Sequence, residues 1–156
     1  MVDKHMLHSF LKSAMERHIR ETSPLVNQLN DDIILSRPLK EGRELGEIIL
    51  HLLRSIEFYM RGLTTDVWEP LPYTLESYKS SEAIKRLANE VFASALDYMD
   101  KVTPDRLLDV TDSFNRSASV AEIILEMIEH GVHHRGQITV YYRLLGIKPH
   151  PIPYII

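Results

Sequence analysis

Histidines are the residues of this chain whose type and spacing point most directly to chemistry. The chain contains eight of them, and three lie in the short segment HGVHHRGQ, at His130, His133 and His134. Imidazole is largely neutral near pH 7 and is the commonest metal-ligating side chain in proteins. His130 and His134 are four residues apart, so on a helix they point to the same side. The pair therefore predicts either a metal site or a hydrogen-bonded pair of core histidines.

A helical wheel separates this pair from its neighbour. His130 and His134 lie about 40° apart on the wheel, whereas His133 lies about 100° from His134, toward the edge of the apolar arc. Two imidazoles on an apolar face are costly unless a metal ion or hydrogen bonds satisfy them. We therefore expect His133 not to be a ligand. The arc that contains the pair also holds Ile123, Met127, Ile138 and Tyr141.

A third ligand would have to come from another helix, and His51 is the candidate. It is the only histidine inside the second predicted helix, at the margin of the apolar stripe. A lone histidine at such a position is more often structural than ligating. Three protein ligands would leave a coordination position open, which suits a catalytic metal more than a structural one. Because H-x3-H is a short motif with many chance matches, the residues alone leave both interpretations open.

Composition excludes several classes of function. The chain has no cysteine, which excludes thiolate zinc sites, cysteine nucleophiles and disulfides. Its net charge of -4, from 18 basic and 22 acidic residues, argues against a nucleic-acid partner. No segment resembles a signal peptide or is apolar for long enough to cross a bilayer. We expect a cytoplasmic protein with no membrane partner.

The elements that must position the histidines are helices. Four segments have the apolar period of amphipathic helices, from about Asp3 to Asn30, Arg43 to Leu63, Ser81 to Asp100 and Val120 to Leu145. Pro24 either kinks the first or restarts it. Ser119 and Glu122 have capping-box spacing, and Gly146 is a good stop for the last helix. No segment shows convincing strand alternation. The prediction is an all-α four-helix bundle with one domain over residues 1–156.

The connection between the second and third helices, from about Thr64 to Ser80, is unusually long. Sixteen or so extended residues reach roughly 50 Å, while a 20-residue helix is about 30 Å long. The connection can therefore span the bundle and leave these two helices parallel.

The segments LGEIILHLLRSIEFYMRGL and EIILEMIEHGVHHRGQITVYYRLLG, with RPLKEGRELGEI before the first and GIKP near the end, resemble the DinB/YfiT-like family over nearly the whole chain. The resemblance implies an up-down-down-up bundle and a divalent metal site at His51, His130 and His134. Zinc and nickel both suit imidazole ligands. The leading hypothesis is therefore a divalent-metal-binding DinB-like protein. Some relatives are S-transferases or isomerases that use a low-molecular-weight thiol, so by analogy the candidate activity is a metal-dependent thiol S-transferase, with catalytic residues and substrate unknown. The alternative is a non-catalytic bundle with a regulatory or assembly role. DNA binding is suggested only by the damage-inducible association of the family name.

Other residues of the same segments carry weaker expectations. Arg135 lies about 100° from His134, which predicts a solvated or ion-paired side chain. Gly131 predicts close helix packing, and Tyr141 and Met127 predict ordinary core packing. Three carboxylates are candidate hydrogen-bond partners for the imidazole N–H groups, namely Glu57, Glu126 and Glu129.

The chain finishes with IKPHPIPYII, in which three prolines prevent a helix. Ile152, Tyr154, Ile155 and Ile156 are too apolar for a freely solvated segment, and such a cluster usually marks a contact. Members of the family often form homodimers, and twofold dimers are the commonest oligomers. We therefore expect a homodimer with this tail docked on protein surface.

Overall fold

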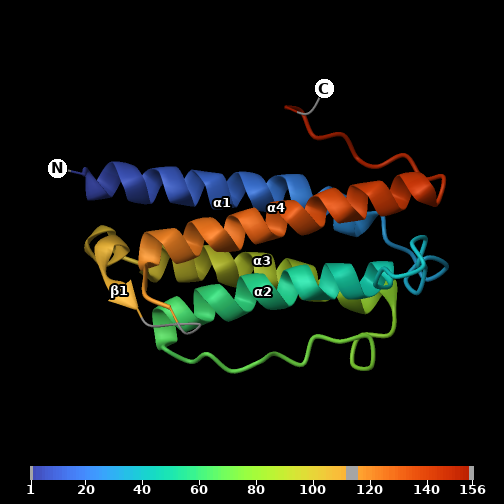
Figure 1. Cartoon of the computed structure of the whole chain (residues 1–156), viewed down its shortest axis with the longest axis horizontal. Coiled ribbons are helices and arrows are strands. Elements are labelled where there is room, and N and C mark those ends of the chain that lie inside the picture. Colours follow the sequence, from blue (N-terminus) through green and yellow to red (C-terminus); the bar gives the residue numbers. More distant parts are fainter. Residues whose placement is uncertain (1, 112–115, 155–156) are drawn as a thin grey trace.

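Four helices form the structure, a computed structural model that describes residues 2–111 and 116–154. They are α1 (Lys4–Asn27), α2 (Leu45–Thr65), α3 (Ser81–Lys101) and α4 (Val120–Leu144). Helices α1 and α4 run in one direction and α2 and α3 in the other (Figure 1). Around the bundle, α4 packs against α1 and α2, and α3 packs against the same two helices. The predicted all-α four-helix bundle is confirmed.

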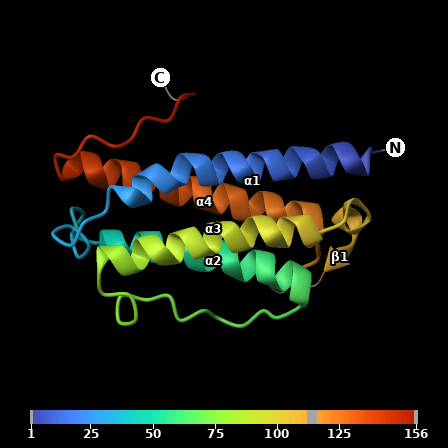
Figure 2. The same cartoon turned by 180° about the vertical axis from the view of Figure 1, so that it is seen from behind.

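The parallel arrangement of α2 and α3 depends on the connection between them. This segment, residues 66–80, runs along the outside of the bundle from the end of α2 to the start of α3 (Figures 1 and 2). Near its start, the ring of Trp68 packs directly against Gly62. A Cβ added at Gly62 would lie only 2.3 Å from the nearest atom of that ring. Any larger side chain at position 62 would displace the ring, so the glycine permits this close approach.

Side-chain caps define where the helices begin. The carboxylate of Asp3 accepts hydrogen bonds from the backbone N–H groups of His5 and Met6 at the start of α1. Ser119 and Glu122 form the predicted capping box at the start of α4. A cap of this kind contributes about 1 kcal/mol to stability. These caps fix where α1 and α4 begin, whereas α2 has no side-chain cap.

The structure differs from the sequence prediction in three places. Helix α1 continues through Pro24 without a restart, because the neighbouring Leu25 and Val26 are buried in the core. Helix α2 begins at Leu45 rather than Arg43, since the preceding loop folds back to accept the first helical N–H groups: Leu45 donates to the Ser36 carbonyl. A 3-10 helix (Pro104–Leu108) and a pair of two-residue strands, β1 (Val110–Thr111) and β2 (Ala118–Ser119), precede α4. Two residues are too few to show alternation.

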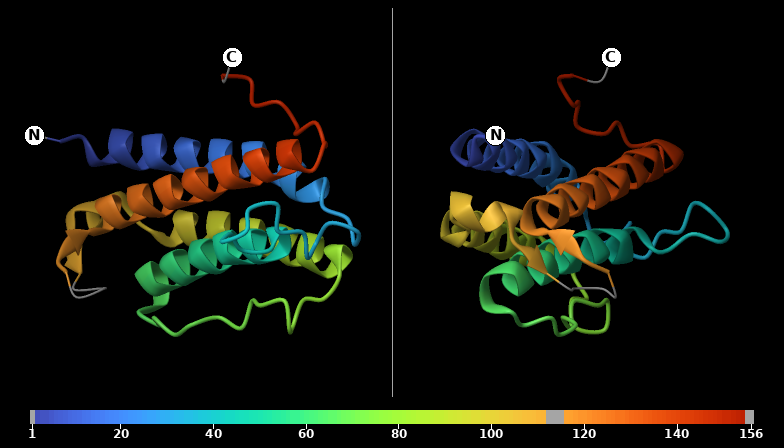
Figure 3. Two further views of the ribbon diagram at one scale, coloured as in Figure 1. Left: turned by 45° about the vertical axis from the view of Figure 1, so that its right-hand side comes forward. Right: turned by 60° about the vertical axis from the view of Figure 1, so that its left-hand side comes forward.

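The segment after α4 turns back and runs along the α1–α4 side of the bundle, away from α2 and α3 (Figure 3). The Gln28 side chain donates to the Lys148 carbonyl at 2.9 Å and accepts from the His150 N–H at 2.7 Å. The Tyr154 hydroxyl accepts from Arg135 at 2.5 Å. Ile155 and Ile156, which belong to the predicted apolar cluster, lie outside the described residues. None of the described helices is long and apolar enough to cross a membrane.

Two glycines of α4 provide a matched test of the α1–α4 packing. A Cβ on Gly131 would lie 2.2 Å from Nε2 of the buried His18, whereas a Cβ on Gly136 would meet nothing within 4 Å. We predict that Gly136→Ala stabilises the protein by about 1 kcal/mol through helix propensity. Gly131→Ala should instead destabilise it by about 1–3 kcal/mol, because the overpacking outweighs that gain. Urea unfolding of both variants measures this, and equal effects would contradict the packing described.

Candidate metal centre

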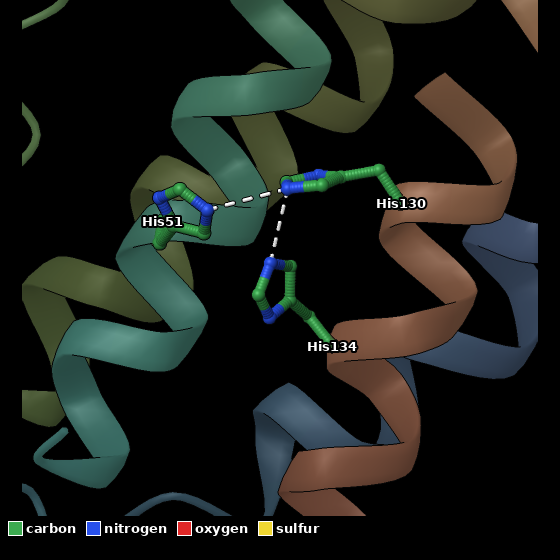
Figure 4. A group of neighbouring side chains, drawn as sticks. All are labelled: His51, His130 and His134. Atoms are coloured by element: carbon green, nitrogen blue, oxygen red, sulfur yellow. Dashed lines mark hydrogen bonds between the residues drawn. The ribbon is translucent and has the colours of Figure 1, made fainter. Parts of the chain in front are cut away.

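Three imidazoles meet where α2 and α4 cross. His51 comes from the middle of α2, and His130 and His134 come from successive turns of α4 (Figure 4). The Nε2 atom of His130 lies 3.3 Å from Nε2 of His51 and 3.1 Å from Nε2 of His134. One ligand atom from each residue lies within 4.8 Å of the others, so the group can hold a metal ion. The structure thus brings together the three histidines singled out in the sequence.

The protons of the three rings show why a cation fits this arrangement. A neutral imidazole carries one N–H, so a proton on Nε2 of His130 can be donated to only one of its two neighbours. A proton on Nδ1 of His130 has no acceptor, because that buried atom has no hydrogen-bond partner among the described residues. A cation among the three Nε2 atoms would use all three lone pairs at once, and it would leave the His130 proton on Nδ1, where no described residue accepts it. The donor set therefore suits a divalent ion with nitrogen ligands.

The site keeps its histidines neutral, which metal binding requires. Burial lowers the pKa of His51 to about 4, with further contributions from the charges of His134 and Arg43. Burial likewise lowers the pKa of His130 to about 4. The pKa of His134 is also lowered by burial, although its hydrogen bond to Gln137 opposes this. At neutral pH all three rings therefore offer lone pairs.

Two neighbours orient the rings, and they are not the carboxylates expected from the sequence. The Gln137 Oε1 atom lies 2.7 Å from Nδ1 of His134, so a proton on Nδ1 leaves Nε2 free to ligate. The Arg54 guanidinium donates to Nδ1 of His51 at 3.2 Å. Ligation by Nε2 of His51 would move its proton to Nδ1, so Arg54 would have to turn away. Arg54 also donates to the Glu47 carboxylate at 2.8 Å.

The predicted carboxylate partners have other roles. Glu57 accepts from the Tyr98 hydroxyl at 3.3 Å, and Glu126 pairs with Arg116. Glu129 is exposed. The sequence pointed to them because they are acidic and near in the chain, whereas Gln137 lies one turn from His134 in the same HHRGQ segment. A search for amides as well as acids at that spacing would have found it.

A cavity of about 520 Å³ opens beside the imidazoles. Its far wall is the loop before α2, held in place by Tyr141, whose hydroxyl donates to the Arg43 carbonyl at 2.9 Å. Tyr141 is therefore both a core residue and a wall of the cavity. His133 also lines the cavity but is exposed, with its ring centroid 5.0 Å from that of His134. The positive charge of Arg43 lowers the pKa of all three clustered histidines.

Comparison with known proteins supports the fold. A sequence model described as the DinB family matches residues 1–155. The uncharacterized protein YjoA of Bacillus subtilis is 22% identical over 130 residues, covering 83% of this chain and 84% of that protein. Its crystal structure, titled as a DinB-like protein, superposes with a TM-score of 0.76 at 19% identity, covering 91% of this chain and 95% of that one. A DinB-like protein from Bacillus cereus gives a TM-score of 0.76 at 20% identity, with the same coverage.

Exchanging single histidines for glutamine tests the ligand set. We predict that His134→Gln loses most of its bound zinc, whereas His133→Gln keeps about one ion per chain, because only His134 directs a nitrogen at the other two rings. Removing a residue that hydrogen-bonds a ligand lowers metal affinity roughly tenfold to hundredfold, and removing the ligand itself should lower the affinity further. Metal analysis of tag-free, zinc-loaded protein measures both. Equal loss in the two variants would exclude this geometry.

The lowered pKa values also predict how acid affects the metal-free protein. Because His51 and His130 have folded-state pKa values of about 4, below the ordinary 6.5, the unfolded chain binds more protons between these values. Stability should therefore fall as the pH falls from about 6.5 to about 4, and should not change through these groups above 6.5. The double variant His51→Gln/His130→Gln should show a shallower fall, while the exposed His5→Gln should not. Thermal melts with chelator from pH 4 to 8 measure this, and parallel curves would contradict it.

Proposed function

The chain belongs to the DinB family, and we propose that it binds one divalent ion, zinc or nickel, on His51, His130 and His134 and uses it as a metal-dependent thiol S-transferase. The observation that carries the proposal is the convergence of three Nε2 atoms from two helices beside a cavity of about 520 Å³. Three nitrogen ligands leave a coordination position for a further group. The cavity is the route by which that group would arrive.

A bound divalent ion with an open position would lower the pKa of a coordinated thiol or water, giving a nucleophile near neutral pH. The chain itself supplies no thiol, because it contains no cysteine. The nucleophile of such a transferase would therefore be a small molecule, and the protein's part is to bind and orient it. Gln137 and Tyr141 hold His134 and the loop wall in position for this.

Arg43 gives the cavity a preference among thiols. It lines the cavity, and its side chain has no hydrogen bond or ion pair among the described residues. Its positive charge acts on all three histidines. Arg43 and the acidic Glu41, which lines the same cavity, are both exposed. A thiol that carries a carboxylate can place its sulfur at the metal and its charge near the guanidinium. We therefore propose that the co-substrate is an anionic thiol.

Nickel-loaded or cobalt-loaded protein gives a direct readout, because a coordinated thiolate produces a charge-transfer absorption band. We predict that mercaptosuccinate and 2-mercaptoethanol both produce the band, and that mercaptosuccinate binds more tightly. Arg43→Gln should weaken mercaptosuccinate by about tenfold, the effect of losing roughly 1.4 kcal/mol, and leave 2-mercaptoethanol unchanged.

If metal-loaded protein shows no band with mercaptosuccinate and none with 2-mercaptoethanol, thiol activation is contradicted, although metal binding is not. A band with both thiols but no change in Arg43→Gln would contradict only the preference for an anion. A Lys40→Gln variant, which removes a charge from the same loop outside the cavity lining, is the matched control.

A further inference from the structure

A second cavity, of about 640 Å³, lies on another side of α4, between that helix and the segment that follows it. Helix α4 contributes Arg135 and Gly136 to its wall, and the returning segment contributes residues 148–152. Figure 3 shows this segment on the α1–α4 side of the bundle, whereas the three histidines lie between α2 and α4 (Figure 4). The cavity is thus separate from the candidate metal centre.

The unusual residue in this wall is Arg135, which the sequence pattern predicted to be solvated or ion-paired. It is neither: the residue is 3% exposed and forms no ion pair among the described residues. Its contacts are the Tyr154 hydroxyl at 2.5 Å and Nδ1 of His18 at 3.4 Å. A buried guanidinium is always charged and is costly without an anionic partner. Among the residues that the structure describes, this buried cation therefore has no counter-ion.

Counting donors and acceptors around His18 shows the same deficit. The Thr22 hydroxyl donates to the His18 carbonyl at 2.6 Å, so toward Nδ1 of His18, 3.3 Å away, it can only accept. If Nδ1 carries the proton and donates to Thr22, it cannot accept from Arg135. If Nε2 carries the proton, that buried N–H has no partner among the described residues. In either tautomer one N–H lacks an acceptor, so the cluster is short of acceptors.

Of this cluster only Arg135 lines the cavity, and the rest of the lining indicates which ligand would pair with its guanidinium. The described part of its lining includes two further cationic side chains, Arg143 and Lys148, and no acidic residue, although the chain as a whole is acidic. The remaining wall is largely apolar, with Val132, Val140 and Ile152. A guanidinium binds a carboxylate through two parallel hydrogen bonds. We propose that this cavity binds the carboxylate of a small molecule with an aliphatic body, with Arg135 as its anchor.

Gly136 allows the cavity to be filled without disturbing the core. A Cβ at this position would meet nothing within 4 Å, and the residue lines the cavity. Gly136→Leu should therefore occupy the binding space, while Gly136→Ala adds one methyl group to the same helix and leaves most of the space open. Arg135→Lys keeps the buried charge but removes the planar fork. Gly136→Leu thus tests filling of the cavity, Gly136→Ala controls for the change in helix propensity, and Arg135→Lys tests recognition of the anion.

Isothermal titration calorimetry with octanoate as the probe tests the proposal on the 156-residue chain. We expect octanoate to bind, octanol to bind at least about tenfold more weakly, and Gly136→Leu to abolish binding while Gly136→Ala retains it. Arg135→Lys should weaken octanoate without affecting octanol. Zinc content should be unchanged in the Gly136 variants, so this test is independent of the metal centre.

Three outcomes would overturn the proposal. Equal affinity for octanoate and octanol would show an apolar cleft without anion recognition. Inorganic phosphate binding more tightly than octanoate would show that the cavity selects a different anion. Octanoate binding that survives Gly136→Leu would place the carboxylate elsewhere on the protein.

Discussion

The antiparallel crossing of α2 and α4 is the constraint on which the site depends. At this crossing three imidazoles replace the apolar side chains that elsewhere fill the bundle. The Nε2 atom of His130 lies 3.1 Å from that of His134 and 3.3 Å from that of His51. So many nitrogens in one place would destabilise an ordinary core, because each buried N–H needs an acceptor. The capping box fixes where α4 begins, and the loop before α2 accepts the first N–H groups of that helix, so both helices of the crossing are held at their starts.

Helix α4 carries two kinds of chemistry on different sides. His134 faces α2 and the first cavity, while the next residue, Arg135, is turned toward α1 and the second cavity. Gly131 lets α1 approach closely enough for His18 to meet Arg135. The HGVHHRGQ segment thus holds the His130–His134 pair, an amide hydrogen-bonded to one of these imidazoles and a buried guanidinium. This combination explains why so short a segment contains few ordinary core residues.

The sequence predicted the features that depend on local periodicity. Spacing and wheel phase placed His130 and His134 together and His133 apart from them, and the capping-box pattern placed the start of α4. Features that depend on contacts between helices were not predictable in this way. Nothing local shows that Arg135 is covered by Tyr154 from the following segment, or that Arg54 reaches His51. His51 itself was chosen as the one mid-helix candidate and by family resemblance, and its ligand role, like the homodimer, stays a prediction.

The coordination of bound zinc tests the central claim most directly. X-ray absorption spectroscopy of tag-free, zinc-loaded protein should show three imidazole nitrogens at about 2.0–2.1 Å and at least one further light atom. The His51→Gln variant should show one imidazole fewer. A spectrum with one imidazole or none in the unmodified protein, or with the same imidazole count in His51→Gln, would contradict a metal centre built from α2 and α4.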